Sequence, residues 1–97
     1  MPAVHLRGQS CTGHQCYPPR VNVQGSPNVY ANGIPVHRQS DMWAIHCCGS
    51  PPNCHSGALV KGSSTVYANG LQLARVGDPV SCGSTAMQGS GTVYCGG

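Results

Sequence analysis

Hydrophobic and polar residues alternate only over short stretches of this chain, and each stretch ends at a sequence that favours a turn. Two stretches follow the same plan: a Val-Tyr-Ala strand leads into Asn-Gly, and a second strand follows over residues 34–38 or 71–75. β-Branched and aromatic residues favour strands, and Asn-Gly supplies the two positive φ angles that a type I′ hairpin turn requires. The pattern therefore predicts an all-β chain with hairpins that turn at Asn32-Gly33 and at Asn69-Gly70.

A nine-residue repeat organises the chain. It begins with Gly-Ser and carries Val-Tyr at its fifth and sixth positions. The copies are residues 25–33, 62–70 and 89–97. Because the third copy has no return strand after it, we expect the N-terminus to supply one, since residues 6–9 parallel residues 75–78. The repeat thus predicts a small β-hairpin fold with pseudo-threefold symmetry, as a single domain over residues 1–97.

The composition leaves little material for a hydrophobic core. Val, Leu, Ile and Phe together number 16 of the 97 residues, whereas Gly and Pro number 22. Disordered chains usually carry a high net charge, but only 7% of the residues are charged here. The chain also has 7 cysteines and 5 histidines, so we expect a metal, disulfides or a partner to hold it together.

The charge pattern and the N-terminus narrow the function classes. Five basic residues are scattered singly against Asp41 and Asp78, so no basic patch indicates a nucleic-acid partner. The apolar runs are too short for a transmembrane helix, and the N-terminus lacks the apolar segment of a signal peptide. We therefore expect synthesis in a reducing cytoplasm and export by a route that reads no signal peptide, which favours a metal over disulfides.

Three metal-binding side chains follow equivalent turns of the three units. His14 and His46 lie five residues after such a turn and Cys82 lies four residues after the third, so all three should converge on the pseudo-threefold axis. His55, just before the next unit, is the predicted fourth ligand. Three histidines and one thiolate would complete a tetrahedral zinc site, and closed coordination is typical of a structural ion rather than a hydrolytic one.

The cysteines near these histidines leave alternatives open. Cys47 adjoins His46 and could replace it as a ligand, since no paired Cys-x-x-Cys spacing fixes the set. Cys11–Cys16 or Cys47–Cys54 could instead form disulfides after export.

Signals of catalysis are weak. The chain has no Gly-x-Ser-x-Gly elbow, no phosphate-binding loop and no His-Glu-x-x-His helix, and it contains no glutamate that could act as a base. Asp41 and Asp78 occupy equivalent turns, where we expect them to accept hydrogen bonds from backbone amides. His5 and His37 fall on predicted strands and are interpreted as structural residues. The sequence therefore predicts a protein that is not an enzyme.

These features together resemble a known family, the PAAR-repeat proteins, which are the small tips of type VI secretion spikes and contractile phage tail spikes. The resemblance is carried by the three Gly-Ser-x-x-Val-Tyr copies, the Asn-Gly turns, the opening Pro-Ala-Val, and residues 35–38 and 73–78. It implies a β-rich cone with pseudo-threefold symmetry and one zinc ion near its sharp end. The family's zinc ligands correspond in this sequence to His14, His46, His55 and Cys82.

The resemblance also implies a partner for the broad end of the cone. In the family this end caps the blunt end of a trimeric β-helical spike of the VgrG type, with one chain for each trimer. We expect Tyr30, Tyr67 and Tyr94 to make this contact, and the other interpretation is that they pack on one another inside the cone. The resemblance further implies contacts with secreted effectors and, transiently, with the target membrane.

The leading hypothesis is thus a non-enzymatic spike tip that is made in the cytoplasm and leaves the cell on a contractile machine. That machine would be a bacterial secretion system or a phage tail. A zinc-held β-domain that binds protein or nucleic acid is one alternative, and it predicts an exposed stripe on one side rather than three equivalent surfaces. A small secreted enzyme or toxin is the other, and it predicts an open metal site with a water ligand.

Overall fold

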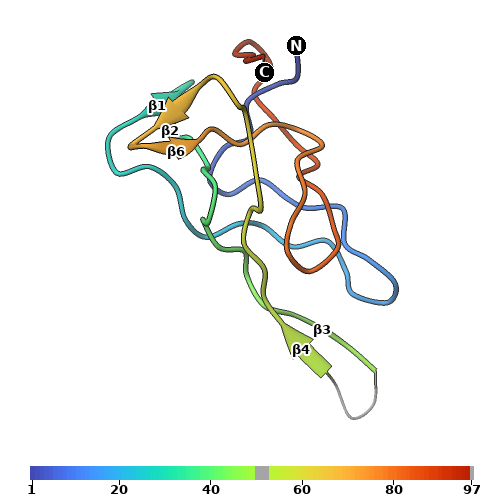
Figure 1. The fold of residues 1–97 in the computed structure, drawn as a ribbon. Coiled ribbons are helices and arrows are strands. Elements are labelled where there is room, and N and C mark those ends of the chain that lie inside the picture. The colour runs from blue at the N-terminus through green and yellow to red at the C-terminus, as the bar shows by residue number, and fades with distance from the viewer. Residues whose placement is uncertain (50–52, 97) are drawn as a thin grey trace.

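The computed structural model describes residues 1–49 and 53–96, which form short strands, bridges and turns (Figure 1). The strands are β1 (Tyr30–Ala31), β2 (Ile34–Pro35), β3 (His46–Cys48), β4 (Asn53–His55), β5 (Tyr67–Ala68) and β6 (Leu71–Gln72). They pair in three antiparallel two-stranded sheets, β1–β2, β3–β4 and β5–β6. The all-β fold class predicted from the sequence is confirmed for the described residues. None of these residues belongs to a helix with the length and apolarity that crossing a membrane requires.

Two hairpins form where the Asn-Gly pairs predicted them. β1 and β2 pair with Tyr30 opposite Pro35, and β5 and β6 pair in the same register. The turn of the first hairpin has positive φ angles, 55° at Asn32 and 75° at Gly33. A Cβ at Gly33 would meet no neighbouring atom, so the backbone angle rather than lack of space explains the glycine.

Three backbone segments close a ring around the axis of the molecule. The amide of His5 donates to the carbonyl oxygen of Ala74 at 2.9 Å, and the amide of Ala74 donates to the carbonyl oxygen of His37 at 3.0 Å. The amide of His37 closes the ring by donating to the carbonyl oxygen of His5, also at 3.0 Å. Residues at equivalent positions of the three units therefore make the same hydrogen bond to another unit. This cyclic pattern is the pseudo-threefold symmetry that the repeat predicted.

The two ends of the chain lie together and form the third unit. Ala3 pairs with Tyr94, and the amide of Val4 donates to the carbonyl of Val93 at 3.0 Å. The equivalent bonds of the other two units, also of 3.0 Å, join Val36 to Val29 and Leu73 to Val66. The N-terminal segment thus supplies the return strand of the third repeat.

The serine of each repeat donates a hydrogen bond to the turn of another unit. The hydroxyl of Ser26 accepts from two amides of its own repeat and donates to Oδ1 of Asn69 at 2.6 Å. The equivalent serines, Ser63 and Ser90, donate to Gly96 and Asn32. Because all three serines are buried, these bonds help to hold the three units in one closed arrangement.

The core consists of two small clusters along the axis. The cluster nearer the broad end contains Val4, Leu6, Ala31, Val36, Ala68, Leu73 and Cys95. The cluster nearer the narrow end contains Cys11, Trp43, Leu59, Ala74, Val80 and Ala86. His5 and His37 are fully buried, and their ring centroids lie 5.5 and 4.4 Å from that of Trp43. Ala74, at the third equivalent position, belongs to the same buried cluster as Trp43.

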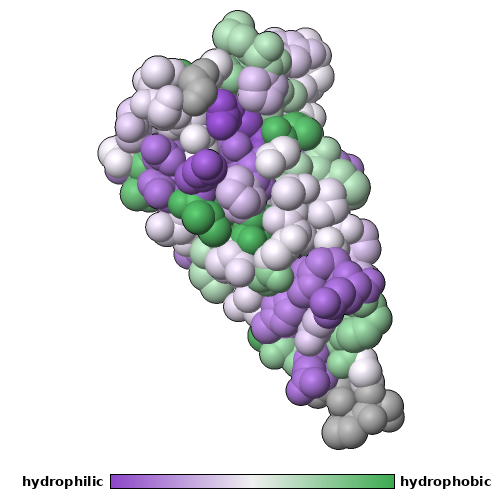
Figure 2. All heavy atoms as spheres, turned by 45° about the vertical axis from the view of Figure 1, so that its right-hand side comes forward, coloured by the Kyte–Doolittle hydropathy of each residue, from purple (hydrophilic) through white to green (hydrophobic). Residues whose placement is uncertain are grey.

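The molecule tapers along its long axis, and its principal extents are 41 × 24 × 22 Å. The β1–β2 and β5–β6 hairpins and both termini lie at the broad end, whereas β3–β4 lies at the narrow end (Figure 1). The space-filling view shows the same narrowing (Figure 2). This is the cone that the family resemblance implied.

Candidate metal centre

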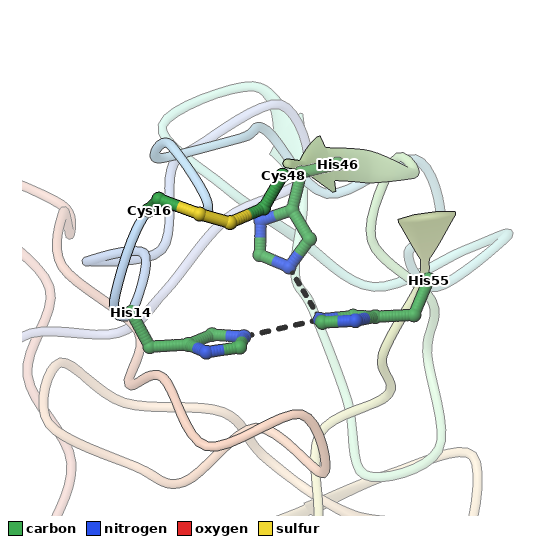
Figure 3. Close-up of a disulfide and its surroundings, with 5 residues drawn as sticks. All are labelled: His14, Cys16, His46, Cys48 and His55. Carbon is green, nitrogen blue, oxygen red and sulfur yellow. Dashed lines mark hydrogen bonds between the residues drawn. A yellow bond between two sulfur atoms is a disulfide. The ribbon is translucent and has the colours of Figure 1, made fainter. Parts of the chain in front are cut away.

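Four side chains converge near the narrow end. His14, His46, His55 and Cys82 each offer one ligand atom, and these atoms lie within 4.8 Å of one another. Nε2 of His55 lies 3.0 Å from Nε2 of His14 and 2.7 Å from Nε2 of His46. The three imidazoles point toward one another (Figure 3). The structure therefore brings together the four residues that the sequence analysis named as ligands.

The backbone positions each of these side chains. β3 and β4 pair with His46 opposite His55, so both side chains project from the same face of the hairpin. His14 lies in a tight loop, because its backbone exchanges two hydrogen bonds with that of Tyr17, of 3.1 and 2.8 Å. Cys82 comes from a separate turn, so four segments of the chain meet at the centre.

Hydrogen bonding orients one of these imidazoles, and desolvation acts on another. Nδ1 of His46 lies 2.9 Å from the carbonyl oxygen of Pro18, which can only accept, so Nδ1 donates to it and Nε2 is the nitrogen that faces the centre. Desolvation lowers the pKa of His55, and the neighbouring His46 and His14 lower it further. Neutral imidazole is the form that binds a metal, so the lowered pKa of His55 favours coordination by that side chain.

The donor set fits a small tetrahedral ion. An ion with bonds of about 2.0–2.3 Å separates its ligand atoms by roughly 3.3–3.6 Å. The four atoms already lie within 4.8 Å of one another, so small side-chain movements suffice. Imidazole nitrogen and thiolate sulfur suit zinc, whereas Mg²⁺ and Ca²⁺ require oxygen ligands. Four protein ligands fill a tetrahedral coordination, which leaves no position for a reacting water.

Two disulfides flank the centre. Cys16 bonds to Cys48, and Cys47 bonds to Cys54. The second bond is one of the pairs that the sequence left open. The Cys11–Cys16 pair is wrong, because Cys11 is buried in the core cluster nearer the narrow end and has a free thiol.

Cys47 does not take the place of His46. Side chains of successive strand residues point to opposite faces, so Cys47 on β3 points away from the face that carries His46. Its sulfur is bonded to Cys54 on the neighbouring strand. Strand alternation therefore decides between the two candidate ligands.

Two ion pairs that the sequence analysis missed lie in the equivalent turns. Oδ2 of Asp41 accepts from the amide and from Nε of Arg38, both at 2.9 Å. In the second unit Asp78 accepts from the amide and from Nε of Arg75, at 2.8 and 3.1 Å. The expectation that these aspartates accept from backbone amides is confirmed. The hydrogen bond that Arg38 donates to Asp41 raises the pKa of Arg38. The signal in the sequence was the Arg-x-x-Asp spacing in both units.

Replacement of Asp78 by Asn should lower the free energy of unfolding by about 1–2 kcal/mol, and replacement by Ala by about 3 kcal/mol. In the third unit Oε1 of Gln9 accepts from the amide of Leu6 at 2.9 Å, so a neutral side chain can make the amide contact. Asn keeps that contact and loses the charge-assisted bonds to Arg75, whereas Ala loses both. Denaturant unfolding measures the two losses, and equal losses would contradict a separate role for the amide contact.

The three repeat tyrosines are exposed at the broad end. Tyr30 and Tyr67 each expose 54% of their surface, and Tyr94 exposes 52%. The interpretation that these rings pack on one another inside the cone is therefore wrong. Their matching exposure follows from their equivalent positions in the three units.

The fold and the donor set define a class of small all-β cones, built from three pseudo-symmetric units, with a histidine and cysteine group that could hold a metal near the narrow end. The model of the PAAR motif family matches residues 12–88. The chain belongs to this family, which is associated with the structural tips of type VI secretion spikes. No curated protein matches the chain at a significant level.

Proposed function

We propose that this chain is a non-enzymatic spike tip that caps the blunt end of a trimeric VgrG-type β-helical spike and sharpens it for piercing the target envelope. The observation that carries the proposal is the broad end, where one chain presents three equivalent surfaces, each with an exposed tyrosine. Membership of the PAAR motif family and the taper toward the narrow end support the same function.

Pseudo-threefold symmetry suits one chain to a threefold partner. A trimeric spike ends in three identical sets of strands, and an asymmetric monomer could contact them only unequally. Here the ring of hydrogen bonds among His5, His37 and Ala74 sets the three units in equivalent positions. A cap of this kind would cover strand edges that could otherwise pair with other chains.

We infer that the ion of the metal centre is a single Zn²⁺ with a structural role. When bound, it would hold together the loop of His14, the β3–β4 hairpin and the turn of Cys82. The free energy of binding would then add to the free energy of folding at the narrow end, where the core is thin. A rigid point is what a piercing function requires.

The route to the target follows from the same proposal. We propose that the protein is made in the cytoplasm and leaves the cell on the contractile machine, in a bacterial secretion system or a phage tail. It would contact the target membrane only transiently, and secreted effectors are its further proposed partners. The association of the family with secretion spikes supports this route.

Replacement of Tyr67 by Ala is expected to weaken binding to a trimeric spike about tenfold or more, because exposed tyrosines contribute strongly at interfaces. The melting temperature should change little, since Tyr67 is 54% exposed and belongs to neither core cluster. Pull-down and affinity measurements with a purified spike test the expectation. Ile45→Ala is the matched control, because Ile45 is 58% exposed but lies next to β3, away from the broad end.

Two outcomes would contradict the proposal. The first is an equal loss of binding in the Tyr67 and Ile45 variants, which would place the contact elsewhere. The second is the absence of any complex between the unmodified chain and a trimeric spike, which would favour a zinc-held binding module of another kind.

A further inference from the structure

The disulfide-bonded cysteines and the candidate metal ligands occupy the same segments of the chain. Each histidine of the centre lies within two residues of a bonded cysteine. The neighbours are His14 with Cys16, His46 with Cys47 and Cys48, and His55 with Cys54. One disulfide therefore ties the loop of His14 to β3, and the other ties β3 to β4. Three of the four ligand segments belong to one covalent frame.

Six of the seven cysteines divide according to their exposure, and Cys82 is the exception. The four that form disulfides are exposed or half-buried: Cys16, Cys47, Cys48 and Cys54. Among the free thiols, Cys11 and Cys95 are buried and Cys82 belongs to the metal group. Burial also raises the pKa of the Cys95 thiol, which lowers its reactivity. With Cys82 bound to the ion, a soluble oxidant would therefore react first with the four cysteines of the frame.

The register of β3 decides both which side chain joins the metal group and which cysteine can bond to Cys16. On β3, His46 lies opposite His55, and Cys48 lies on the same face as His46 because the two are two positions apart on the strand. From that face Cys48 meets Cys16, and their disulfide runs beside the imidazoles (Figure 3). A shift of β3 by one residue would bring Cys47 to this face and turn His46 away from it. A bond between Cys16 and Cys47 is therefore incompatible with His46 in the metal group.

We propose that the two disulfides form a redox lock on the metal centre: the bound ion selects the Cys16–Cys48 and Cys47–Cys54 pairs as the thiols oxidise, and the oxidised frame then binds the ion more tightly. The inference rests on the proposed structural ion. By thermodynamic linkage, the factor by which the ion favours this pairing equals the factor by which the pairing favours the ion. In a reducing compartment the ion alone would hold the narrow end, and after transfer to an oxidising one both would hold it.

The oxidation balances as exchange with a small disulfide such as oxidised glutathione. One protein thiolate attacks a glutathione sulfur, which forms a mixed disulfide and releases one reduced glutathione. The second protein thiolate attacks the protein sulfur of the mixed disulfide, which closes the protein disulfide and releases the second glutathione. Each protein pair loses two electrons and two protons, and one oxidised glutathione becomes two reduced ones.

Two double variants of the full chain report on the pairing. Cys47→Ser/Cys54→Ser keeps Cys16 and Cys48, the pair that the structure contains. Cys48→Ser/Cys54→Ser keeps Cys16 and Cys47, a pair that the proposal forbids when the ion is bound. Each variant is reduced, then equilibrated with a glutathione redox buffer in the presence of zinc or of a chelator. Tryptic peptides analysed by mass spectrometry give the ratio of crosslinked to reduced cysteines.

We expect zinc to raise the ratio for the Cys16–Cys48 pair at least tenfold and to lower the ratio for Cys16–Cys47. In chelator competition, the oxidised unmodified chain should bind zinc at least tenfold more tightly than the Cys16→Ser/Cys48→Ser variant. If zinc protects Cys16 and Cys48 from oxidation, or leaves both ratios unchanged, the redox lock is refuted.

The affinity measurement also separates the redox lock from the metal centre on which it rests. Equal zinc affinity of the oxidised chain and the Cys16→Ser/Cys48→Ser variant would refute the redox lock and leave the structural ion in place. Absence of zinc binding in both proteins would refute the proposed ion itself, and the redox lock with it.

Discussion

Removal of the metal ion by a chelator is expected to lower the free energy of unfolding of the reduced protein by about 4 kcal/mol or more. An ion present at about 1,000 times its dissociation constant stabilises the folded state by about 4.1 kcal/mol, because only the folded chain assembles the ligands. The narrow end depends on this term, since its core cluster contains only two large side chains, Trp43 and Leu59, among small ones.

Unfolding by denaturant with and without chelator measures this loss, and elemental analysis of the purified protein should find about one zinc per chain. His55→Ala removes the imidazole that contacts both other histidines, so it should abolish zinc binding and the effect of the chelator. Asn53→Ala is the matched control, because Asn53 is an exposed residue of the same strand and offers no ligand. A chelator effect of equal size in the two variants would contradict the metal centre.

The hairpins and the ligand group could be predicted because they follow from local sequence and from symmetry. Asn32-Gly33 sets its turn type through two backbone angles, without help from distant contacts. The ligands lie far apart in the sequence, but the repeat equates the turns that precede His14, His46 and Cys82. The repeat therefore indicates which residues far apart in the chain come together, and a single sequence without a repeat usually does not.

The features that escaped prediction lie where the symmetry is broken or where the ring closes. The β3–β4 hairpin occurs in one unit, so no second copy reveals its path, and the partner of Cys16 was sought nearby at Cys11 instead of at Cys48. The full burial of His5 and His37 also could not be predicted. Side chains along a strand alternate between two faces, and the sequence does not say which face is buried. Only the closed ring of backbone hydrogen bonds shows that the face of His5 and His37 points toward the axis.

Acidification is expected to destabilise the metal-free protein because two histidines are buried in their neutral form. Burial lowers the pKa of His37 from 6.5 to about 4, and burial also lowers the pKa of His5. Nδ1 of His37 lies 2.8 Å from the carbonyl oxygen of Gln24, to which it donates. Its Nε2 has no hydrogen-bond partner among the described residues, so no group on that side stabilises a second proton.

The sign of the effect follows from the two states of His37. Below pH 6.5 the unfolded chain takes up a proton at this side chain, whereas the folded chain takes one up only near pH 4. The free energy of unfolding is therefore unaffected above pH 6.5 and decreases as the pH falls through this window. The loss reaches about 3 kcal/mol for His37 alone near the lower limit, and His5 adds to it in the same direction.

Denaturant unfolding of the chelated protein between about pH 7.5 and pH 4 measures this loss without the competing release of zinc by protons. His37→Asn cannot titrate and keeps an N–H donor for Gln24, so it should lose less stability than the unmodified chain on acidification. Leu59→Ala is the matched control, because it removes a fully buried side chain without changing any titratable group. It should lower the free energy of unfolding equally at every pH. If His37→Asn keeps the full pH dependence, the buried neutral histidine is not its origin.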